Sequence, residues 1–142
     1  MAYLTHRMPL AIAWAHCDPA GIVWNPRFFE FFDTATWQMF ETTLGVPKEK
    51  LFERFGIVGI PLVESGANFS IALKFGDAAE IVSTVAEFRR SSFHVRHQIM
   101  KDGKLAVDGL EKRVWAGRDP GDAARLRAIA LPGEVIEKFR AK

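Results

Sequence analysis

Several features that would place the chain in a special class of protein are missing from its 142 residues. Cys17 is the only cysteine, so no disulfide can form within the chain, and a reducing compartment is the simpler expectation. No apolar run is long enough to span a membrane. The apolar residues 8–15 lead directly into Cys17-Asp18 without a signal-peptide cleavage site. We therefore expect a cytoplasmic protein.

A strong charge of either sign is also absent. The formal net charge is +2, which is too small to indicate a nucleic-acid partner. No internal repeat, low-complexity segment or linker interrupts the chain, and neither of the common glycine-rich nucleotide-binding motifs is present. Apolar residues make up 49% and charged residues 25%, as in ordinary globular proteins. We expect one domain, residues 1–142, with a core of its own.

The clearest local pattern is a long helix over residues 26–44. Asn25 is a favourable N-cap, Pro26 suits the first helical position, and Gly45 ends the helix. Its apolar residues cover most of the circumference rather than one stripe, which is typical of a buried helix; they are Phe28, Phe29, Phe31, Phe32, Ala35, Trp37, Met39, Phe40 and Leu44. A short amphipathic helix is predicted over residues 48–55.

The remaining pattern is that of strands, predicted over residues 5–15, 57–63, 67–75, 80–90, 92–100, 104–116 and 126–131. The first strand is largely apolar, so we expect both of its faces to be buried or nearly so. Residues 92–100 alternate in polarity as a half-solvated antiparallel strand does. Asp102-Gly103 indicates a hairpin, Glu64-Ser65-Gly66 a break, and Pro132 the start of a terminal helix.

An antiparallel sheet whose helices come early in the chain predicts an α+β fold. A single sheet can cover only part of the long helix. The aromatic side chains left over predict a partner, so we expect at least a dimer.

One stretch, residues 14–25, carries the residues best suited to chemistry. Asp18 follows an apolar run and precedes the tight turn Pro19-Ala20-Gly21, just before the long helix. Such a carboxylate can act as a base or a nucleophile. The unpaired N–H groups of a helix N-terminus can stabilise negative charge. The alternative is that Asp18 only stabilises its own turn, as the aspartate of an Asp-Pro pair commonly does.

The motif D-P-A-G-I-V-W at residues 18–24 resembles the 4-hydroxybenzoyl-CoA thioesterase family of hotdog-fold enzymes. Further matches follow in chain order: Asp33, Gly56-Ile57-Val58-Gly59 with Pro61, Arg89-Arg90 with Ser92-Phe93, and Arg125-Leu126-Arg127-Ala128-Ile129 with Pro132. Aliphatic acyl-CoA thioesterases share the aspartate motif, and the other blocks favour the aryl-CoA branch. Two positions depart from the family pattern: His16, where an acidic residue is frequent, and Asn25, where an aromatic residue occurs.

The resemblance implies a hotdog fold, in which an antiparallel sheet wraps around a long central helix. It also implies hydrolysis of an aryl-CoA thioester to a carboxylic acid and free CoA. Asp18 would be the nucleophile or general base. Because Pro26 has no N–H, the backbone of Trp24 or Asn25 would polarise the thioester carbonyl. Asp33 would belong to the acyl-binding region; the alternative is an exposed or dimer-facing aspartate paired with an arginine.

Two further groups are candidates for substrate binding. Arg89, Arg90 and Ser91 form a basic and hydroxyl cluster that suits the phosphates of CoA, although such clusters are commonly ordinary hairpin ends. Gly59 and Ile60 lie in a glycine- and proline-containing segment that we place along the acyl pocket.

A catalytic thiol and a metal site are both disfavoured. Cys17 neighbours Asp18, so in a strand it points to the opposite face, where a small core residue is the commoner role. His94 and His97 also face opposite sides of a strand, so no metal is expected. We expect no cofactor, because CoA is part of the substrate.

The expected partners are thus a small-molecule acyl-CoA and a second copy of the chain, with no nucleic acid and no membrane. The assembly would be a homodimer or homotetramer with sites at its interface. Three rival functions stay open: hydrolysis of short or medium aliphatic acyl-CoA or acyl-carrier protein, non-catalytic binding of an acyl thioester, and hydration or dehydration. The last would need a histidine in the site, for which His16 is the nearby candidate.

Overall fold

The computed structural model describes residues 2–141. The helices are α1 (Pro26–Leu44), α2 (Lys48–Phe55) and α3 (Gly133–Phe139), with a short 3₁₀ turn at Trp14–His16. The strands are β1 (Thr5–Ala11), β2 (Leu62–Phe69), β3 (Ala78–Phe88), β4 (Ser92–Lys101), β5 (Lys104–Val114), β6 (Ala116–Asp119) and β7 (Asp122–Ala128). None of the helices in this described part has the length and apolar character needed to cross a membrane.

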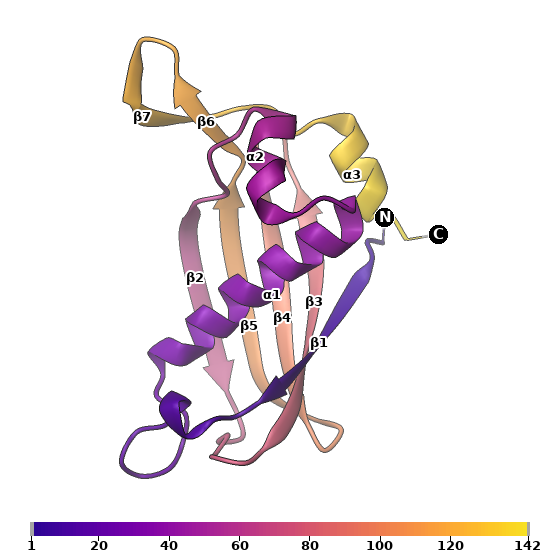
Figure 1. Ribbon diagram of the computed structural model, residues 1–142. Coiled ribbons are helices and arrows are strands. Elements are labelled where there is room, and N and C mark those ends of the chain that lie inside the picture. The colour runs from indigo at the N-terminus through magenta and orange to yellow at the C-terminus, as the bar shows by residue number, and fades with distance from the viewer. Residues whose placement is uncertain (1, 142) are drawn as a thin grey trace.

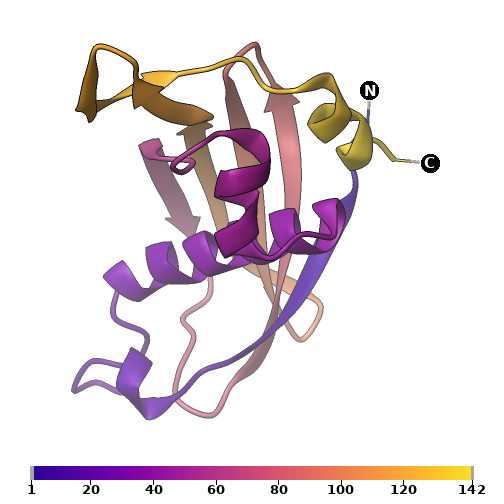
Figure 2. The same ribbon diagram turned by 45° about the horizontal axis from the view of Figure 1, so that its top comes forward.

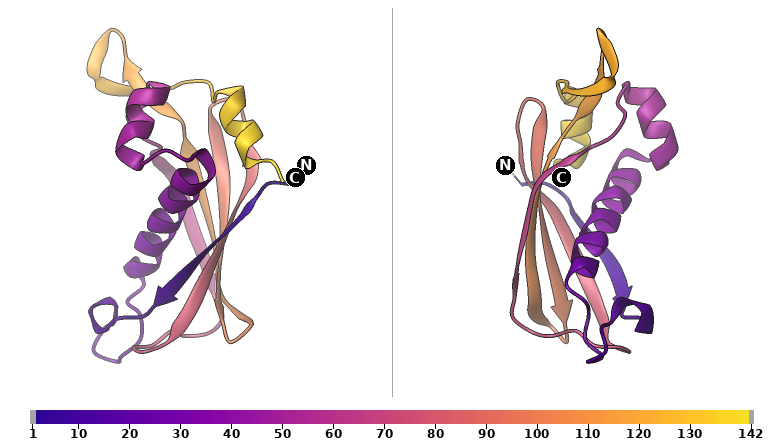
Figure 3. Two further views of the ribbon diagram at one scale, coloured as in Figure 1. Left: turned by 45° about the vertical axis from the view of Figure 1, so that its right-hand side comes forward. Right: turned by 90° about the vertical axis from the view of Figure 1, so that its left-hand side faces the viewer.

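Five strands form one antiparallel sheet in the order β1-β3-β4-β5-β2, and α1 lies across one face of it (Figure 1). The side views show the sheet curving around the helix (Figure 3). The expected α+β class and hotdog arrangement are confirmed. The β6–β7 hairpin projects beyond the end of the sheet (Figure 2).

Within one chain, α1 buries one face against the sheet and exposes the other. The buried residues are Phe28, Phe31, Phe32, Ala35, Thr36, Met39, Phe40 and Leu44. Asp33 and Gln38 are exposed on the opposite face, while Phe29 and Trp37 are half-buried. The core accordingly forms two apolar clusters, one under each half of the helix.

The alternation predicted for residues 92–100 is confirmed, because the side chains of Phe93, Val95, His97 and Ile99 in β4 are fully buried. The hairpin at Asp102-Gly103 is also present, with φ values of 51° and 74°. Both residues adopt the left-handed backbone that a two-residue hairpin turn requires.

Four local predictions are wrong. The first strand ends at Ala11 and buries alternate residues, because an edge strand packs only one face on the helix. Within residues 57–75, one continuous strand, β2 (Leu62–Phe69), runs across the expected break, and residues 57–61 and 70–75 lie outside it. Its ladder with β5 holds the turn-favouring residues 64–66 in extended form. The last strand is β7, which begins at residue 122 and pairs with β6.

The fourth error concerns the helix start. Asn25 makes no side-chain capping bond, and its own backbone is already helical, with φ −46° and ψ −44°. Its side chain therefore does not serve as the expected N-cap.

Candidate active site

The residues before α1 form a small hairpin whose tip is the D-P-A-G sequence. Cys17 pairs with Val23, and the Asp18 N–H donates to the Ile22 carbonyl at 2.9 Å. Gly21 closes the tip with a φ of 81°, a conformation that favours glycine. These bonds join residues close in sequence. The hairpin is also held by a distant segment, because the Val23 N–H donates to the Leu73 carbonyl at 2.9 Å and the Phe75 N–H donates to the Gly21 carbonyl at 3.1 Å.

The Asp18 carboxylate is half-buried and uses one oxygen to hold its own turn. Its Oδ1 accepts the N–H of Ala20 at 2.8 Å. Within residues 2–141 no cation pairs with Asp18, and its Oδ2 has no hydrogen-bond partner. The turn-stabilising role is therefore present, but it occupies only one of the two oxygens. The other oxygen is free to react or to accept a proton.

The start of α1 offers one open N–H donor. The Trp24 N–H already donates to the His16 carbonyl at 2.9 Å, so this predicted donor is engaged in the fold. Pro26 has no N–H. In the part of the chain that the structure describes, the N–H of Asn25 has no hydrogen-bond partner. Of the two predicted donors, Asn25 alone is open, at the positive end of the helix dipole.

An apolar hollow of about 240 Å³ lies beside this helix start. Its lining residues include Ile22, Asn25, Phe28, Phe69 and Ile71. Large apolar side chains are exposed around it, among them Trp14, Trp24 and Phe75. The open N–H of Asn25 thus belongs to a residue that borders an apolar recess, and the surrounding surface is one that another molecule could cover.

The Cys17 side chain is half-buried. Its side chain packs against the apolar cluster under the first half of α1, and its Sγ lies 3.6 Å from the Ala13 carbonyl. This placement supports a core residue rather than a nucleophile.

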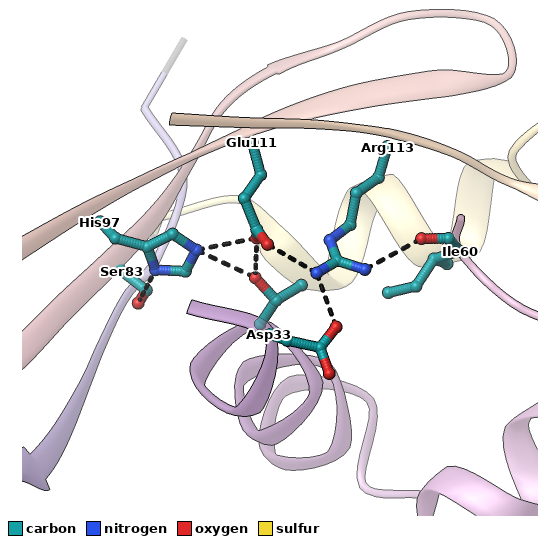
Figure 4. A network of polar contacts seen from close by, with 7 residues as sticks. Asp33, Ile60, Ser83, His97, Glu111 and Arg113 are labelled. Atoms are coloured by element: carbon teal, nitrogen blue, oxygen red, sulfur yellow. Dashed lines mark hydrogen bonds and ion pairs between the residues drawn. The ribbon is translucent and has the colours of Figure 1, made fainter. Parts of the chain in front are cut away.

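Asp33 lies further along α1 and is exposed and paired with an arginine, as the alternative interpretation of this residue expects; which arginine it is, Arg113, was not predicted. Its Oδ1 accepts from the Nη2 of Arg113 at 2.8 Å. The side chain of Asp33 is 53% exposed, whereas that of Arg113 is 4% exposed. Arg113 also donates through Nη1 to the Ile60 carbonyl at 3.0 Å. One guanidinium therefore joins α1, β5 and the segment before β2 (Figure 4).

Behind Arg113, a polar network runs through the core between the two apolar clusters (Figure 4). The Glu111 carboxylate accepts from Arg113 Nη2 at 2.6 Å and from the Thr36 hydroxyl at 2.5 Å. Its third donor is His97 Nε2, at 2.9 Å, because an ionised carboxylate can only accept. The other ring nitrogen of His97 lies 2.7 Å from the hydroxyl of Ser83. The buried carboxylate is thus fully paired.

These contacts determine the ionisation of the buried groups. Burial alone would raise the pKa of Glu111, but hydrogen bonds from His97 and Arg113 and the charge of Arg113 outweigh it and lower that pKa to about 2. Burial alone would lower the pKa of Arg113, but Glu111 and Asp33 raise it above its usual value. Both buried groups are therefore charged near neutral pH.

The sequence does contain a signal for this network. Glu111 and Arg113 are two residues apart in a strand, so they share a face with the buried Val107 and Trp115. Charged residues on the buried face of a strand require partners. That rule would have singled out both residues, although not which partners they have.

The Arg89–Ser91 cluster forms the turn between β3 and β4. Arg89 is exposed and donates to Glu87 at 3.0 Å. The carbonyl of Arg90 accepts from Leu131, and that of Ser91 accepts from Trp115. The backbone of this turn is therefore held in place while its arginine side chains extend to the surface.

The predicted site residues fall into three groups that one chain does not bring together. Asp18, Trp24 and Asn25 lie beside the start of β3, and Arg89–Ser91 follow its end, about 35 Å away for an eleven-residue strand. Asp33, Gly59 and Ile60 lie between them, near Arg113. The Ile60 side chain is packed in the core, 3% exposed, so only its backbone is available there.

Comparison with known proteins identifies the class. The chain belongs to the thioesterase-like superfamily, whose family model matches residues 12–139. Among its relatives is the 4-hydroxybenzoyl-CoA thioesterase of Pseudomonas sp. strain CBS-3, which is 36% identical over 137 residues, covering 92% of this chain and 94% of the relative. The resemblance inferred from the motifs is confirmed.

Solved structures agree with this membership. The structure of the Pseudomonas sp. strain CBS-3 enzyme matches with a TM-score of 0.86 and 34% identity, covering 94% of this chain and 98% of that one. A 4-hydroxybenzoyl-CoA thioesterase with an aspartate replaced by asparagine, complexed with 4-hydroxybenzoyl-CoA, matches with a TM-score of 0.85 and 33% identity, covering 95% and 98%. A gentisyl-coenzyme A thioesterase matches with a TM-score of 0.78 and 29% identity, covering 94% and 98%.

Proposed function

We propose that this protein hydrolyses an aryl-CoA thioester, similar to 4-hydroxybenzoyl-CoA, to the carboxylic acid and free CoA. The observation that carries the proposal is the pairing of a carboxylate and an open N–H on one rigid unit. Asp18 has a free oxygen at the hairpin tip, and the Asn25 N–H is unpaired at the adjoining helix start within the described chain. Relatives that are 29–36% identical act on aryl-CoA thioesters, which supports this substrate class.

In the proposed reaction, the Asn25 N–H and the helix dipole polarise the thioester carbonyl as negative charge develops on its oxygen. Asp18 acts in one of two ways. As a nucleophile it forms a mixed anhydride and releases the CoA thiolate, and water then hydrolyses the anhydride. As a general base it takes a proton from the water that attacks the carbonyl. The complex of an aspartate-to-asparagine relative with its CoA thioester supports an aspartate in this role. Neither route uses a metal or a cofactor.

We further propose that the enzyme is cytoplasmic and is a homodimer or homotetramer with its sites at the subunit interface. Arg89, Arg90 and Ser91 would bind the CoA phosphates of a site whose Asp18 belongs to another subunit. The separation of these groups within one chain supports this arrangement. So does α1, since Asn25 and Asp33 are about 12 Å apart along the helix axis, further than a single aromatic ring extends.

The edge of the sheet supports the same assembly. β2 is an edge strand that pairs with β5 alone among the described strands, and nearly all of its residues are exposed. An unpaired edge with exposed apolar residues such as Leu62, Val63 and Phe69 is a suitable surface for a second copy.

The test of the reaction is release of free thiol from benzoyl-, 4-hydroxybenzoyl-, acetyl- and octanoyl-CoA. We expect the largest kcat/KM for an aroyl thioester. Preference for acetyl- or octanoyl-CoA would identify an aliphatic thioesterase instead. Binding of these thioesters without thiol release would identify a non-catalytic acyl-thioester-binding domain.

Subunit mixing tests the interface. Asp18→Asn chains and Arg89→Ala/Arg90→Ala chains are unfolded together and refolded as a mixture. If one chain supplies Asp18 and another supplies the arginines, mixed assemblies contain some intact sites, and activity exceeds that of either variant alone. A mixture no more active than its two components would show that each site is built from one chain.

A further inference from the structure

Arg113 contacts Asp33 and Ile60, two of the residues that are expected from the sequence to lie in the acyl-binding region. We propose that Arg113 is a positioning residue for acyl recognition: it fixes the Asp33 carboxylate and the Ile60 carbonyl, so that Asp33 presents one oxygen in one direction to a hydroxylated aroyl group. This inference rests on the proposed function, which supplies the substrate class. It adds a residue that acts on the substrate only through others.

The geometry of Arg113 suits this role. Its Nη2 holds Asp33 Oδ1 at 2.8 Å, and its Nη1 holds the Ile60 carbonyl at 3.0 Å. A guanidinium is planar and rigid, so two bonds from different nitrogens fix the relative positions of their acceptors. A lysine ammonium, which is a point charge on a flexible stem, would not hold both acceptors in the same way.

The guanidinium is itself held from behind. Glu111 accepts from Nη2 at 2.6 Å, and Glu111 in turn is held by His97 and Thr36. The side chains of Glu111 and His97 are 1% and 0% exposed. The support therefore lies in the rigid core, between strands β4 and β5 and helix α1, while the supported group, Asp33, reaches the surface.

The consequence for Asp33 is a carboxylate with one oxygen occupied and one available. Within residues 2–141 its Oδ2 has no hydrogen-bond partner, and half of the side chain is exposed. An ionised carboxylate accepts hydrogen bonds and cannot donate them. A phenolic hydroxyl matches a fixed acceptor, whereas an unsubstituted ring leaves that acceptor unpaired. Discrimination between the two should therefore depend on how firmly Asp33 is held.

The experiment measures the ratio of kcat/KM for 4-hydroxybenzoyl-CoA to that for benzoyl-CoA. It is measured in the wild type, Arg113→Lys, Asp33→Asn and the double variant. General loss of folded enzyme cancels in this ratio. We expect Arg113→Lys and Asp33→Asn each to lower the ratio about tenfold, as for a weakened hydrogen bond to a charged group. The double variant should lose no more than Asp33→Asn alone, because Arg113 acts through Asp33.

Arg96→Lys is the matched control. Arg96 in β4 donates two hydrogen bonds to Asp108 in β5, at 3.0 Å and 3.2 Å. These strands also carry His97 and Glu111, but the Arg96–Asp108 pair is exposed and contacts no residue of the predicted acyl-binding region. Its ratio should equal that of the wild type.

Three results would overturn the inference while leaving the proposed function intact. The first is a wild type that hydrolyses both thioesters without discriminating between them. The second is an Arg113→Lys variant that keeps the wild-type ratio. The third is a double variant in which the effects of Arg113→Lys and Asp33→Asn multiply. If the wild type releases thiol from neither thioester, the proposed function fails, and this inference fails with it.

Asp33→Glu provides the test if Arg113→Lys does not fold. Asp33 is half exposed, and glutamate keeps the charge that pairs with Arg113 while moving the free oxygen by one methylene. If Arg113 holds the Asp33 carboxylate in place, the kcat/KM ratio of Asp33→Glu should be about tenfold lower than that of the wild type. A wild-type ratio in Asp33→Glu means that the carboxylate is not fixed, which overturns the inference.

Discussion

Asp18 and Glu111 are two acidic groups of this protein that are held in opposite ways. Within the described chain, the Asp18 carboxylate accepts only from the N–H of Ala20, two residues on, and its other oxygen has no partner. Glu111 accepts from Thr36, His97 and Arg113, which come from α1, β4 and β5. A carboxylate that is to react needs an unoccupied oxygen, whereas a buried carboxylate that organises a core needs every oxygen paired.

The two groups should also differ in how their removal changes the rate of hydrolysis and the free energy of unfolding. On the proposed function, loss of Asp18 removes the reacting carboxylate and should leave its hairpin largely intact. Loss of a partner of Glu111 leaves an uncompensated charge in the core. Replacement of Asp18 should therefore lower the rate of hydrolysis with little change in the free energy of unfolding. Replacement of a Glu111 partner should mainly lower the free energy of unfolding.

Asp18→Asn should have the largest effect. We expect kcat to fall by about 10²–10⁴-fold, because asparagine is neither a base nor a nucleophile of comparable strength. The thermal midpoint should stay close to that of the wild type, since the asparagine oxygen can still accept from Ala20. Thiol release and thermal melting measure the two quantities.

The control is Asp119→Asn. Asp119 accepts the N–H of Gly121 at 2.8 Å, in the same local arrangement, but at the tip of the β6–β7 hairpin. This variant should keep wild-type activity. Full activity in Asp18→Asn would remove Asp18 from the reaction.

Arg113→Met should have the largest effect on stability. It leaves Glu111 buried without its cation, and breaking a buried pair from one side typically costs about 3–5 kcal/mol in the free energy of unfolding. Urea unfolding measures the loss. Arg7→Met is the comparison, because Arg7 pairs with Glu80 at 2.7 Å on the surface, where such a pair contributes about 1 kcal/mol or less. Equal losses in the two variants would mean that burial does not distinguish the pairs.

Acid should weaken the fold through Glu111. The pKa of this group is about 2 in the folded protein and about 4.5 in an unfolded chain. Because the folded value is the lower one, the stabilisation is complete above about pH 5 and is lost as the pH falls toward 2. At about 1.4 kcal/mol for each unit of pKa separation, the contribution is about 3 kcal/mol.

The measurement is the free energy of unfolding against pH for the wild type and Glu111→Gln. The difference between the two curves should shrink from pH 5 to pH 2. Glu80→Gln changes an exposed carboxylate, so the difference between its curve and that of the wild type should vary less with pH. A Glu111→Gln curve parallel to the wild type would contradict the assigned hydrogen bonds.

The same contrast explains how much of the molecule could be predicted from sequence. The helix over residues 26–44, the alternation of residues 92–100 and the hairpin at Asp102-Gly103 all depend on neighbouring residues, and all three predictions are confirmed. The prediction for Asp18 has a similar local basis, since its turn and the adjoining helix are contiguous in the chain, but its catalytic role stays a prediction. Local chemistry was sufficient for the three confirmed elements.

The buried network could not be predicted in the same way, because it depends on strand register. Ser83 lies opposite His97, and Val95 lies opposite Glu111, which places Glu111 diagonally from His97. A shift of one residue in either ladder would reverse which side chains face the core. The course of β2 was also mispredicted for this reason, since its pairing with β5 overrides the turn preference of residues 64–66.

Gly109→Ala should have the smallest effect, and it tests whether the network depends on the packing around it. A Cβ at Gly109 would clash with the ring of Phe32, and that ring stacks on His97 with a centroid distance of 4.9 Å. The ring must therefore move, and overpacking of this kind typically costs about 1–3 kcal/mol. Urea unfolding measures the cost, with Gly133→Ala as the control because a Cβ there meets no atom within 4 Å. The acid-dependent part of stability should also shrink, since a displaced Phe32 releases His97 from Glu111. An unchanged acid dependence would show that the hydrogen bonds alone, without the ring above them, hold the network.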